Sequence, residues 1–282
     1  MSTVASERPS RNGGSGGVTP GERVYFGAVA VLALWVGVWG YFAPTLVEKA
    51  LPFHVPPLHA RFLGSVYLSG VVIALGAVMA RRWYQVREVP IMTAIWTGGL
   101  GLISLLHLDA FPSGRPQTWI WFAAYVVYPL IAVWLAWSHW SERGDGGAPI
   151  PPWATRYLRV QGVILVVVSV LLLLLPGVMV DIWPWPIDRM LAQMYSAPLL
   201  SYGVGSLLMA RRRTWREIRV PIVGMSAFAT LALVASVIHQ DLFSLSDIED
   251  VTWFALLGAI SVGLAVLVTG ALAAGRAQST GR

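Results

Sequence analysis

The sequence contains no cysteine. This absence excludes disulfide bonds, thiolate metal ligands and a cysteine nucleophile. Charged residues are also scarce, because they make up 12% of the chain, whereas about a quarter of an ordinary soluble domain is charged. A Walker A phosphate loop and a His-Glu-x-x-His zinc motif are absent as well. Together these absences argue against a soluble domain, and they favour a protein that is not an enzyme and needs no cofactor.

The chain has long apolar runs instead. Hydrophobic residues make up 56% of it, and its mean hydropathy is +0.64. A membrane-spanning helix needs roughly 20 mostly apolar residues, and continuous rather than alternating apolar runs indicate helices. We therefore predict an all-α membrane protein with eight transmembrane helices. They are expected over 24–42, 62–80, 90–107, 119–137, 161–180, 191–210, 221–238 and 253–272.

The loops between the runs differ in charge. The loop after the second run carries Arg81, Arg82 and Arg87, and the loop after the sixth carries five arginines between 211 and 219. The loop after the seventh run has four acidic residues and no basic residue. Because basic loops stay in the cytoplasm, both termini are expected there. Membrane orientation thus explains the net charge of +6 without a nucleic-acid partner. Nineteen of the twenty basic residues are arginine, as in GC-rich genomes, which points to a bacterial plasma membrane.

The chain contains an internal repeat. A His-x-Asp-x-Phe motif at 107–111 returns at 239–243, and we call the shift between these two copies the repeat offset. Other identical pairs at the repeat offset are Pro44 and Pro176, Pro52 and Pro184, Ala60 and Ala192, Ser69 and Ser201, Trp83 and Trp215, Trp121 and Trp253, and Phe122 and Phe254. Pro90 and Pro221 match with a slip of a single position. We predict a tandem duplication of a four-helix unit, whose even number of spans makes the two repeats parallel.

This duplication sets the expected organisation of the chain. It begins with a disordered cytoplasmic tail over 1–22, which is rich in Gly, Ser and charge. A first four-helix repeat follows over 23–138, then a cytoplasmic linker over 139–159 and a second four-helix repeat over 160–273. A short cytoplasmic tail over 274–282 ends the chain.

The two motifs place His107, Asp109, His239 and Asp241 at the outer ends of the third and seventh expected helices. One interpretation is structural, because His suits the carbonyl end of a helix and Asp caps the turn that follows. The other is a ligand site. Two His and two Asp are a ligand set for a divalent metal, and two His are axial ligands for haem.

Two arginines form a second candidate site. Arg61 and Arg189 follow outer loops rich in proline and aromatic residues. These loops are either stiff turns in the interfacial aromatic belt or a lid over an outward-facing pocket. A guanidinium suits a carboxylate or phosphate ligand. The structural alternative is an ion pair with Asp109, Asp241 or Asp188.

Three functions remain after these arguments. The first is a small-molecule or lipid-handling transporter or binding protein, with an outward-facing site between the repeats. The second is a structural or assembly subunit of a membrane complex, with other subunits or further copies of itself as partners in the bilayer. The third is a haem or metal redox protein that uses His107 and His239.

Overall fold

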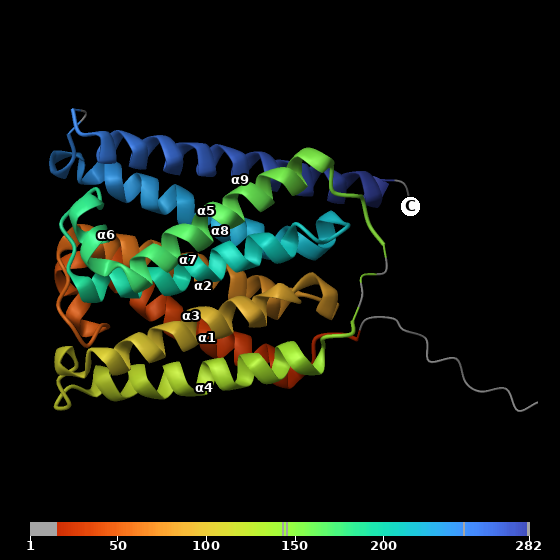
Figure 1. The fold of residues 1–282 in the computed structure, drawn as a ribbon. Helices are drawn as coiled ribbons and strands as arrows, with labels where there is room; N and C mark the ends of the chain where they lie inside the picture. Colours follow the sequence, from red (N-terminus) through yellow and green to blue (C-terminus); the bar gives the residue numbers. More distant parts are fainter. Residues whose placement is uncertain (1–15, 143, 145, 245, 281–282) are drawn as a thin grey trace, which may run out of the picture.

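The computed structural model describes residues 16–142, 144, 146–244 and 246–280. This part of the chain is helical and contains no strand. Figure 1 shows a single bundle of long helices with connections at its two ends. The long helices are α1 (Pro20–Phe42), α2 (Pro57–Met79), α3 (Glu88–Leu106), α4 (Pro116–Ser138), α5 (Pro152–Leu174), α7 (Arg189–Met209), α8 (Trp215–Ile238) and α9 (Ile248–Thr280). The short ones are α6 (Pro176–Ile182) and the 3-10 turns η1 (Pro44–Lys49), η2 (Trp83–Gln85), η3 (Leu108–Ala110) and η4 (Gln240–Leu242).

Seven helices in the described part of the chain are long and apolar enough to cross a membrane. They are α1, α2, α3, α4, α5, α8 and α9. Large apolar side chains on the outside of the bundle, among them Leu130, Trp134 and Val262, are exposed. A soluble monomer rarely exposes apolar surface on this scale. The prediction of an all-helical membrane protein is therefore confirmed.

The remaining long helix, α7, is less apolar than the others. It has 21 residues and contains Gln193 together with several serines and tyrosines, and most of its side chains are buried. A helix surrounded by other helices contacts protein rather than lipid, so its side chains can be more polar. The structure thus supports seven of the eight predicted spans by composition.

Several helices begin earlier than their apolar runs. Helix α2 starts at Pro57 and α5 at Pro152, because proline suits the first helical position, where its missing N–H has no partner. Thr19 caps α1, and the Glu22 side chain accepts a hydrogen bond from the Thr19 N–H at 2.7 Å. Helix α1 thus begins inside the stretch expected as a tail over 1–22, and α5 begins inside the linker expected over 139–159. Of that tail, residues 1–15 lie outside the described residues.

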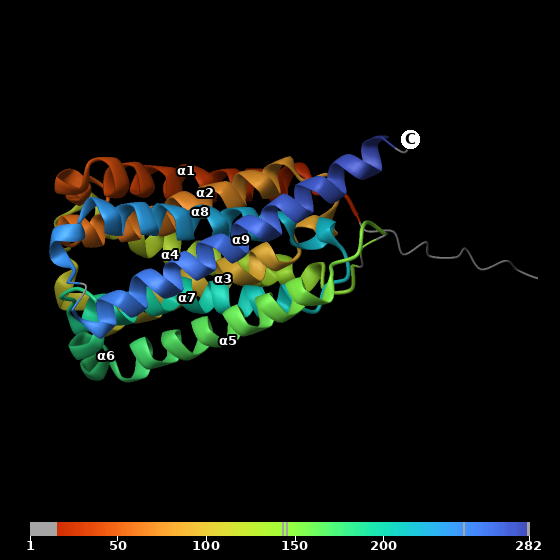
Figure 2. The same ribbon diagram turned by 90° about the horizontal axis from the view of Figure 1, so that it is seen from above.

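The helices pack in a paired pattern. Helix α1 packs on α2 and α3 on α4, just as α5 packs on α7 and α8 on α9. Two further pairs, α2 with α8 and α3 with α7, join the first half of the chain to the second. Figure 2 shows α8 beside α2 and α7 beside α3 from above. The centre of the bundle is therefore built from α2, α3, α7 and α8.

Helices α1 and α2 approach closely where Gly40 faces Gly64. A Cβ atom added to Gly64 would lie 2.5 Å from the backbone nitrogen of Tyr41, and one added to Gly40 would lie 2.8 Å from the carbonyl oxygen of Ala60. Only glycine leaves room for this approach of two backbones, which is a common way for membrane helices to pack.

A buried ion pair joins the two halves of the chain where α3 begins. Arg212, in the loop after α7, donates through its Nε to a carboxylate oxygen of Glu88 at the start of α3. The Glu88 side chain is fully buried, and that of Arg212 is largely buried. Since a buried carboxylate is costly without a partner, Arg212 is required to hold Glu88 in this position.

Candidate functional site

The two His-x-Asp-x-Phe motifs lie at the same end of the bundle, which we call the motif end (left in Figure 1). His107 ends α3 and His239 ends α8, and each is followed by a 3-10 turn. The other end carries the start of α1, the last residues of α9 and the loops rich in arginine, and we call it the arginine-rich end. The predicted helix exits at both histidines are thus present.

Each motif histidine contacts a side chain of the other half of the chain. His107 donates from Nε2 to the amide oxygen of Gln193 on α7 at 2.7 Å, because that oxygen can only accept. His239 Nε2 contacts a guanidinium nitrogen of Arg61 on α2. Since a guanidinium has donors only, His239 accepts this bond and is neutral, with its proton on Nδ1. Gln193 also donates to the carbonyl of Leu173 at 3.0 Å.

These two contacts lie at positions that correspond at the repeat offset. Arg61 and Gln193 stand at the repeat offset, as do His107 and His239. Each contact joins the first turns of one helix to the end of a helix in the opposite half, α2 to α8 and α7 to α3. The histidines therefore act as bridges between the halves.

The remaining predicted site residues do not join these bridges. Asp109, Asp241 and Arg189 are exposed. Asp188 caps α7 by accepting a hydrogen bond from the Leu191 N–H at 2.7 Å. Among the described residues no ion pair links Arg61 or Arg189 to any of the three aspartates. The alternative in which these arginines pair with aspartate is not found there.

The four motif residues do not converge on one point. In the described part of the chain, no group of three or more His, Asp or Glu side chains is placed to hold a metal ion. The Arg61 guanidinium also lies against Nε2 of His239, and a metal at that nitrogen would face this positive charge. The metal and haem interpretation stays a prediction, without support from this geometry.

The phenylalanine of each motif is part of an aromatic cluster at the motif end. Phe111 packs on Phe53 and Phe122 with ring centroids 5.5 and 5.3 Å apart. The equivalent rings in the second half pack in the same way: Phe243 on Trp185 at 6.0 Å and on Phe254 at 5.1 Å. Leu51, Val55 and Ile187 in the preceding loops are buried. The loops at the motif end are thus packed caps on the bundle.

The pH dependence of the Arg61–His239 contact follows from its chemistry. Partial burial and the Arg61 charge lower the pKa of His239 from 6.5, and Asp241 raises it less. Because the folded-state pKa is below the unfolded one, this contact stabilises the fold above about pH 6.5, and the stabilisation is lost as the pH falls through the folded-state pKa. We expect thermal stability in detergent to fall more between pH 7.5 and 5 for the wild type than for His239→Gln. Equal pH dependence of the two proteins would contradict this geometry.

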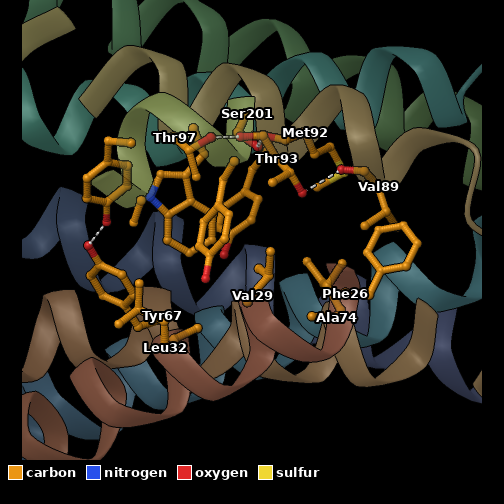
Figure 3. Close-up of a pocket in the computed structure, with 18 residues that line it drawn as sticks. Phe26, Val29, Leu32, Tyr67, Ala74, Val89, Met92, Thr93, Thr97 and Ser201 are labelled. Carbon is orange, nitrogen blue, oxygen red and sulfur yellow. Dashed lines mark hydrogen bonds between the residues drawn. The ribbon is translucent and has the colours of Figure 1, made fainter. Parts of the chain in front are cut away.

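A pocket inside the bundle was not expected from the sequence. It lies between α1, α2, α3 and α4, with α7 closing one side, and encloses about 60 Å³. Figure 3 shows Phe26, Val29 and Leu32 on one wall and Thr93, Thr97 and Ser201 on the other. Among the described residues, its lining contains no charged side chain and seven hydroxyl groups: those of Tyr67, Thr93, Thr97, Tyr125, Tyr128, Ser201 and Tyr202.

The hydroxyl groups of this pocket are already hydrogen-bonded within the protein. Tyr67 bonds to Tyr125 across the pocket, and Ser201 donates to the carbonyl of Met92 at 2.7 Å. Thr93 and Thr97 donate to carbonyls one turn earlier in α3 at 2.8 and 2.7 Å. A hydroxyl can both donate and accept. A ligand can therefore form a further hydrogen bond with a hydroxyl that already has one partner in the protein.

The two halves differ at this pocket. At the repeat offset, the three tyrosines of α2 and α4 that line it correspond to apolar residues. Tyr67, Tyr125 and Tyr128 correspond to Leu199, Leu257 and Ile260. The tyrosine hydroxyls that α2 and α4 place in the pocket therefore have no counterpart in the second half, and nothing in the sequence periodicity distinguishes these tyrosines from ordinary packing residues.

No protein-family model, curated protein or solved structure matches this chain. The interpretation of its function therefore rests on the geometry and chemistry of its own residues.

Proposed function

We propose that this chain is an eight-span membrane protein of duplicated architecture that binds a small uncharged molecule in the hydroxyl-lined pocket, as a transporter or transporter-like binding protein. Both termini lie in the cytoplasm of a bacterial cell, and the arginine-rich end faces inward. The pocket is the observation that carries the proposal. It is a cavity in the bundle lined by aromatic and hydroxyl side chains, which is the usual composition of a small-molecule site.

The position of α7 supports eight spans. Its 21 residues correspond to about 30 Å of helix, which matches the hydrocarbon thickness of a bilayer. It packs along α5 and α3, both of which are apolar enough to span. Its polar residues are sheltered by these neighbours, so the low apolar content of α7 does not prevent it from crossing the membrane.

Equivalent hydrogen bonds support the duplication. Tyr25 donates to the carbonyl of Tyr128 at 3.0 Å, and Tyr157, its counterpart at the repeat offset, donates to the carbonyl of Ile260 at 3.0 Å. Trp121 donates to Ser104 at 2.8 Å, and Trp253 donates to Ser236 at 3.0 Å. The helix pairs α2–α8 and α7–α3 also exchange under the same offset. A pseudo-two-fold axis along the membrane normal explains all three observations.

The chemistry of the lining defines the ligand class. An ion is disfavoured, because none of the described residues that line the pocket is charged and a charge there would be desolvated without a partner. A flat apolar molecule with one hydrogen-bonding group fits best, since Trp96 and the tyrosines supply ring faces and the hydroxyls supply hydrogen bonds. The pocket also differs from the outward-facing site that the sequence predicted, because none of the motif residues line it.

Indole binding tests this proposal. In saturation-transfer NMR on protein in nanodiscs, with empty nanodiscs as the background, indole should bind saturably and benzoate should not. Ala74→Leu adds volume to the pocket wall and should weaken indole binding about tenfold or more. Ala28→Leu adds the same volume at an exposed position of α1 and should leave binding unchanged. Benzoate binding as tight as that of indole, or equal effects of the two variants, would refute the proposed site.

A further inference from the structure

A groove at the arginine-rich end is separate from the pocket. It is formed by the C-terminal end of α2, the 3-10 turn η2, the first turns of α8 and the C-terminal part of α9, and it measures about 800 Å³. One part of its lining is apolar and includes Val72, Val220, Val223 and Leu272. These residues lie on α2, α8 and α9, which are long and apolar enough to span a membrane.

The other part of the groove is basic. Arg81, Arg82, Arg216 and Arg219 line it and are exposed, and among the described residues that line it there is no Asp or Glu. The nearby acid Glu217 accepts hydrogen bonds from the backbone N–H groups of Arg213 and Thr214, so its side chain caps the start of α8. The groove therefore carries a concentrated positive charge beside an apolar surface.

The first half of the chain uses the equivalent arginine for structure. Arg87, the counterpart of Arg219 at the repeat offset, donates to the carbonyls of Glu142 and Trp140 at 2.7 and 2.6 Å. The neighbouring Glu88 is buried and paired with Arg212. Arg87 is thus held by the fold, whereas its counterpart Arg219 lines the groove, and the general preference for arginine in cytoplasmic loops does not explain this difference.

We propose that this groove binds an anionic phospholipid of the adjoining leaflet. The phosphate lies among Arg81, Arg216 and Arg219, because guanidinium groups bind phosphate through paired N–H donors. One acyl chain lies along Val72, Val220 and Leu272, where a soluble anion would gain nothing. The site rests on the membrane placement of this end and is independent of the hydroxyl-lined pocket.

The ends of the chain are poor occupants for the groove. Residues 1–15 contain Glu7 against Arg8 and Arg11, and residues 281–282 contain only Arg282 as a charged side chain. The side chains of both segments therefore carry net positive charge, which does not complement four arginines. A juxtamembrane cluster of arginines instead attracts anionic lipid headgroups, by an amount that salt screens.

Lipid titration by native mass spectrometry of the full chain, delipidated in detergent, tests the proposal. Phosphatidylglycerol should bind at a saturable site, and phosphatidylcholine should bind more weakly. The double variant Arg216→Gln with Arg219→Gln should lose about tenfold or more in phosphatidylglycerol affinity. The matched control is Arg211→Gln with Arg213→Gln, which removes the same charge from exposed residues outside the groove and should change affinity less than threefold. Arg219→Gln alone is the milder variant if the double variant unfolds.

Three results would overturn the proposal. Equal losses in the groove variant and its control would assign the binding to overall charge. Equal affinity for phosphatidylcholine would show that the groove does not prefer a headgroup with net negative charge. Displacement of phosphatidylglycerol by millimolar inorganic phosphate would identify a site for a soluble anion rather than a lipid. Indole binding in the pocket is measured separately, so failure at one site leaves the result at the other intact.

Discussion

Replacing Arg212 with alanine is expected to destabilise the protein by about 3–5 kcal/mol. The substitution leaves the carboxylate of Glu88 fully buried at the start of α3 without its cationic partner. Glu88 must then either remain charged in an apolar environment or take up a proton, and both lower the free energy of unfolding. Unfolding in mixed micelles, followed by circular dichroism against increasing dodecyl sulfate, measures the loss.

A double variant distinguishes the cost of leaving the Glu88 carboxylate unpaired from the loss of the Arg212 side chain itself. Glu88→Gln removes the negative charge, so the combination of Glu88→Gln with Arg212→Ala should be only about 1–3 kcal/mol less stable than the wild type. Arg211→Ala, at the exposed neighbouring position, should change stability by less than about 0.5 kcal/mol. A double variant that is no more stable than Arg212→Ala would show that the buried carboxylate is not the cause.

The second large effect is expected at the crossing of α1 and α2. Gly64→Ala places a methyl group 2.5 Å from the backbone nitrogen of Tyr41, and a backbone atom cannot move aside as a flexible side chain can. The helices must separate, which costs about 3 kcal/mol, at the upper end of the range for overpacked cores. Loss of the α1–α2 contact should appear as a lower unfolding midpoint in the same dodecyl sulfate titration.

Gly27→Ala is the matched control on α1. A Cβ atom at Gly27 would meet nothing within 4 Å, so the variant should be as stable as the wild type or slightly more stable, because alanine favours the helix. If both alanine variants behave alike, the close approach of the two backbones has no part in stability.

The fold was predictable to the extent that lipid exposure dictates composition. The outer helices α4, α5 and α9 contact lipid, so their apolar runs appear directly in the sequence. Helix α7 illustrates the limit, because its neighbours shelter it and its polar residues lower its hydropathy. Helix starts were also predicted late, since capping and proline at the first position extend a helix beyond its apolar part, as Pro152 does for α5.

The candidate site was predicted in position but not in its contacts. The sequence placed His107 and His239 at helix ends, where they lie, but the partners it suggested for Arg61 were an anionic ligand or an aspartate rather than His239. The partners come from opposite halves, so no local spacing reports them. One signal was available, because Arg61 and Gln193 stand at the repeat offset and make equivalent contacts.

The buried pair of His59 and Tyr195 was missed for a related reason. His59 Nδ1 lies 2.7 Å from the Tyr195 hydroxyl and joins α2 to α7, but neither residue has an identical counterpart at the repeat offset. The hydroxyl-lined pocket was also missed, because it depends on which faces of α2, α3 and α4 converge. Periodicity identifies a buried face without identifying its neighbour.

The pairing of α2 with α8 has a consequence for the order of synthesis. The face of α2 that α8 covers is made early, and α8 follows after α3, α4, α5 and α7 have left the ribosome. At roughly 5–20 residues per second, α8 emerges on the order of ten seconds after α2. During that interval the α2 face that awaits α8 is covered by lipid or by the insertion machinery. Premature termination between α4 and α5 would release a half-protein in which this face of α2 is never covered by α8.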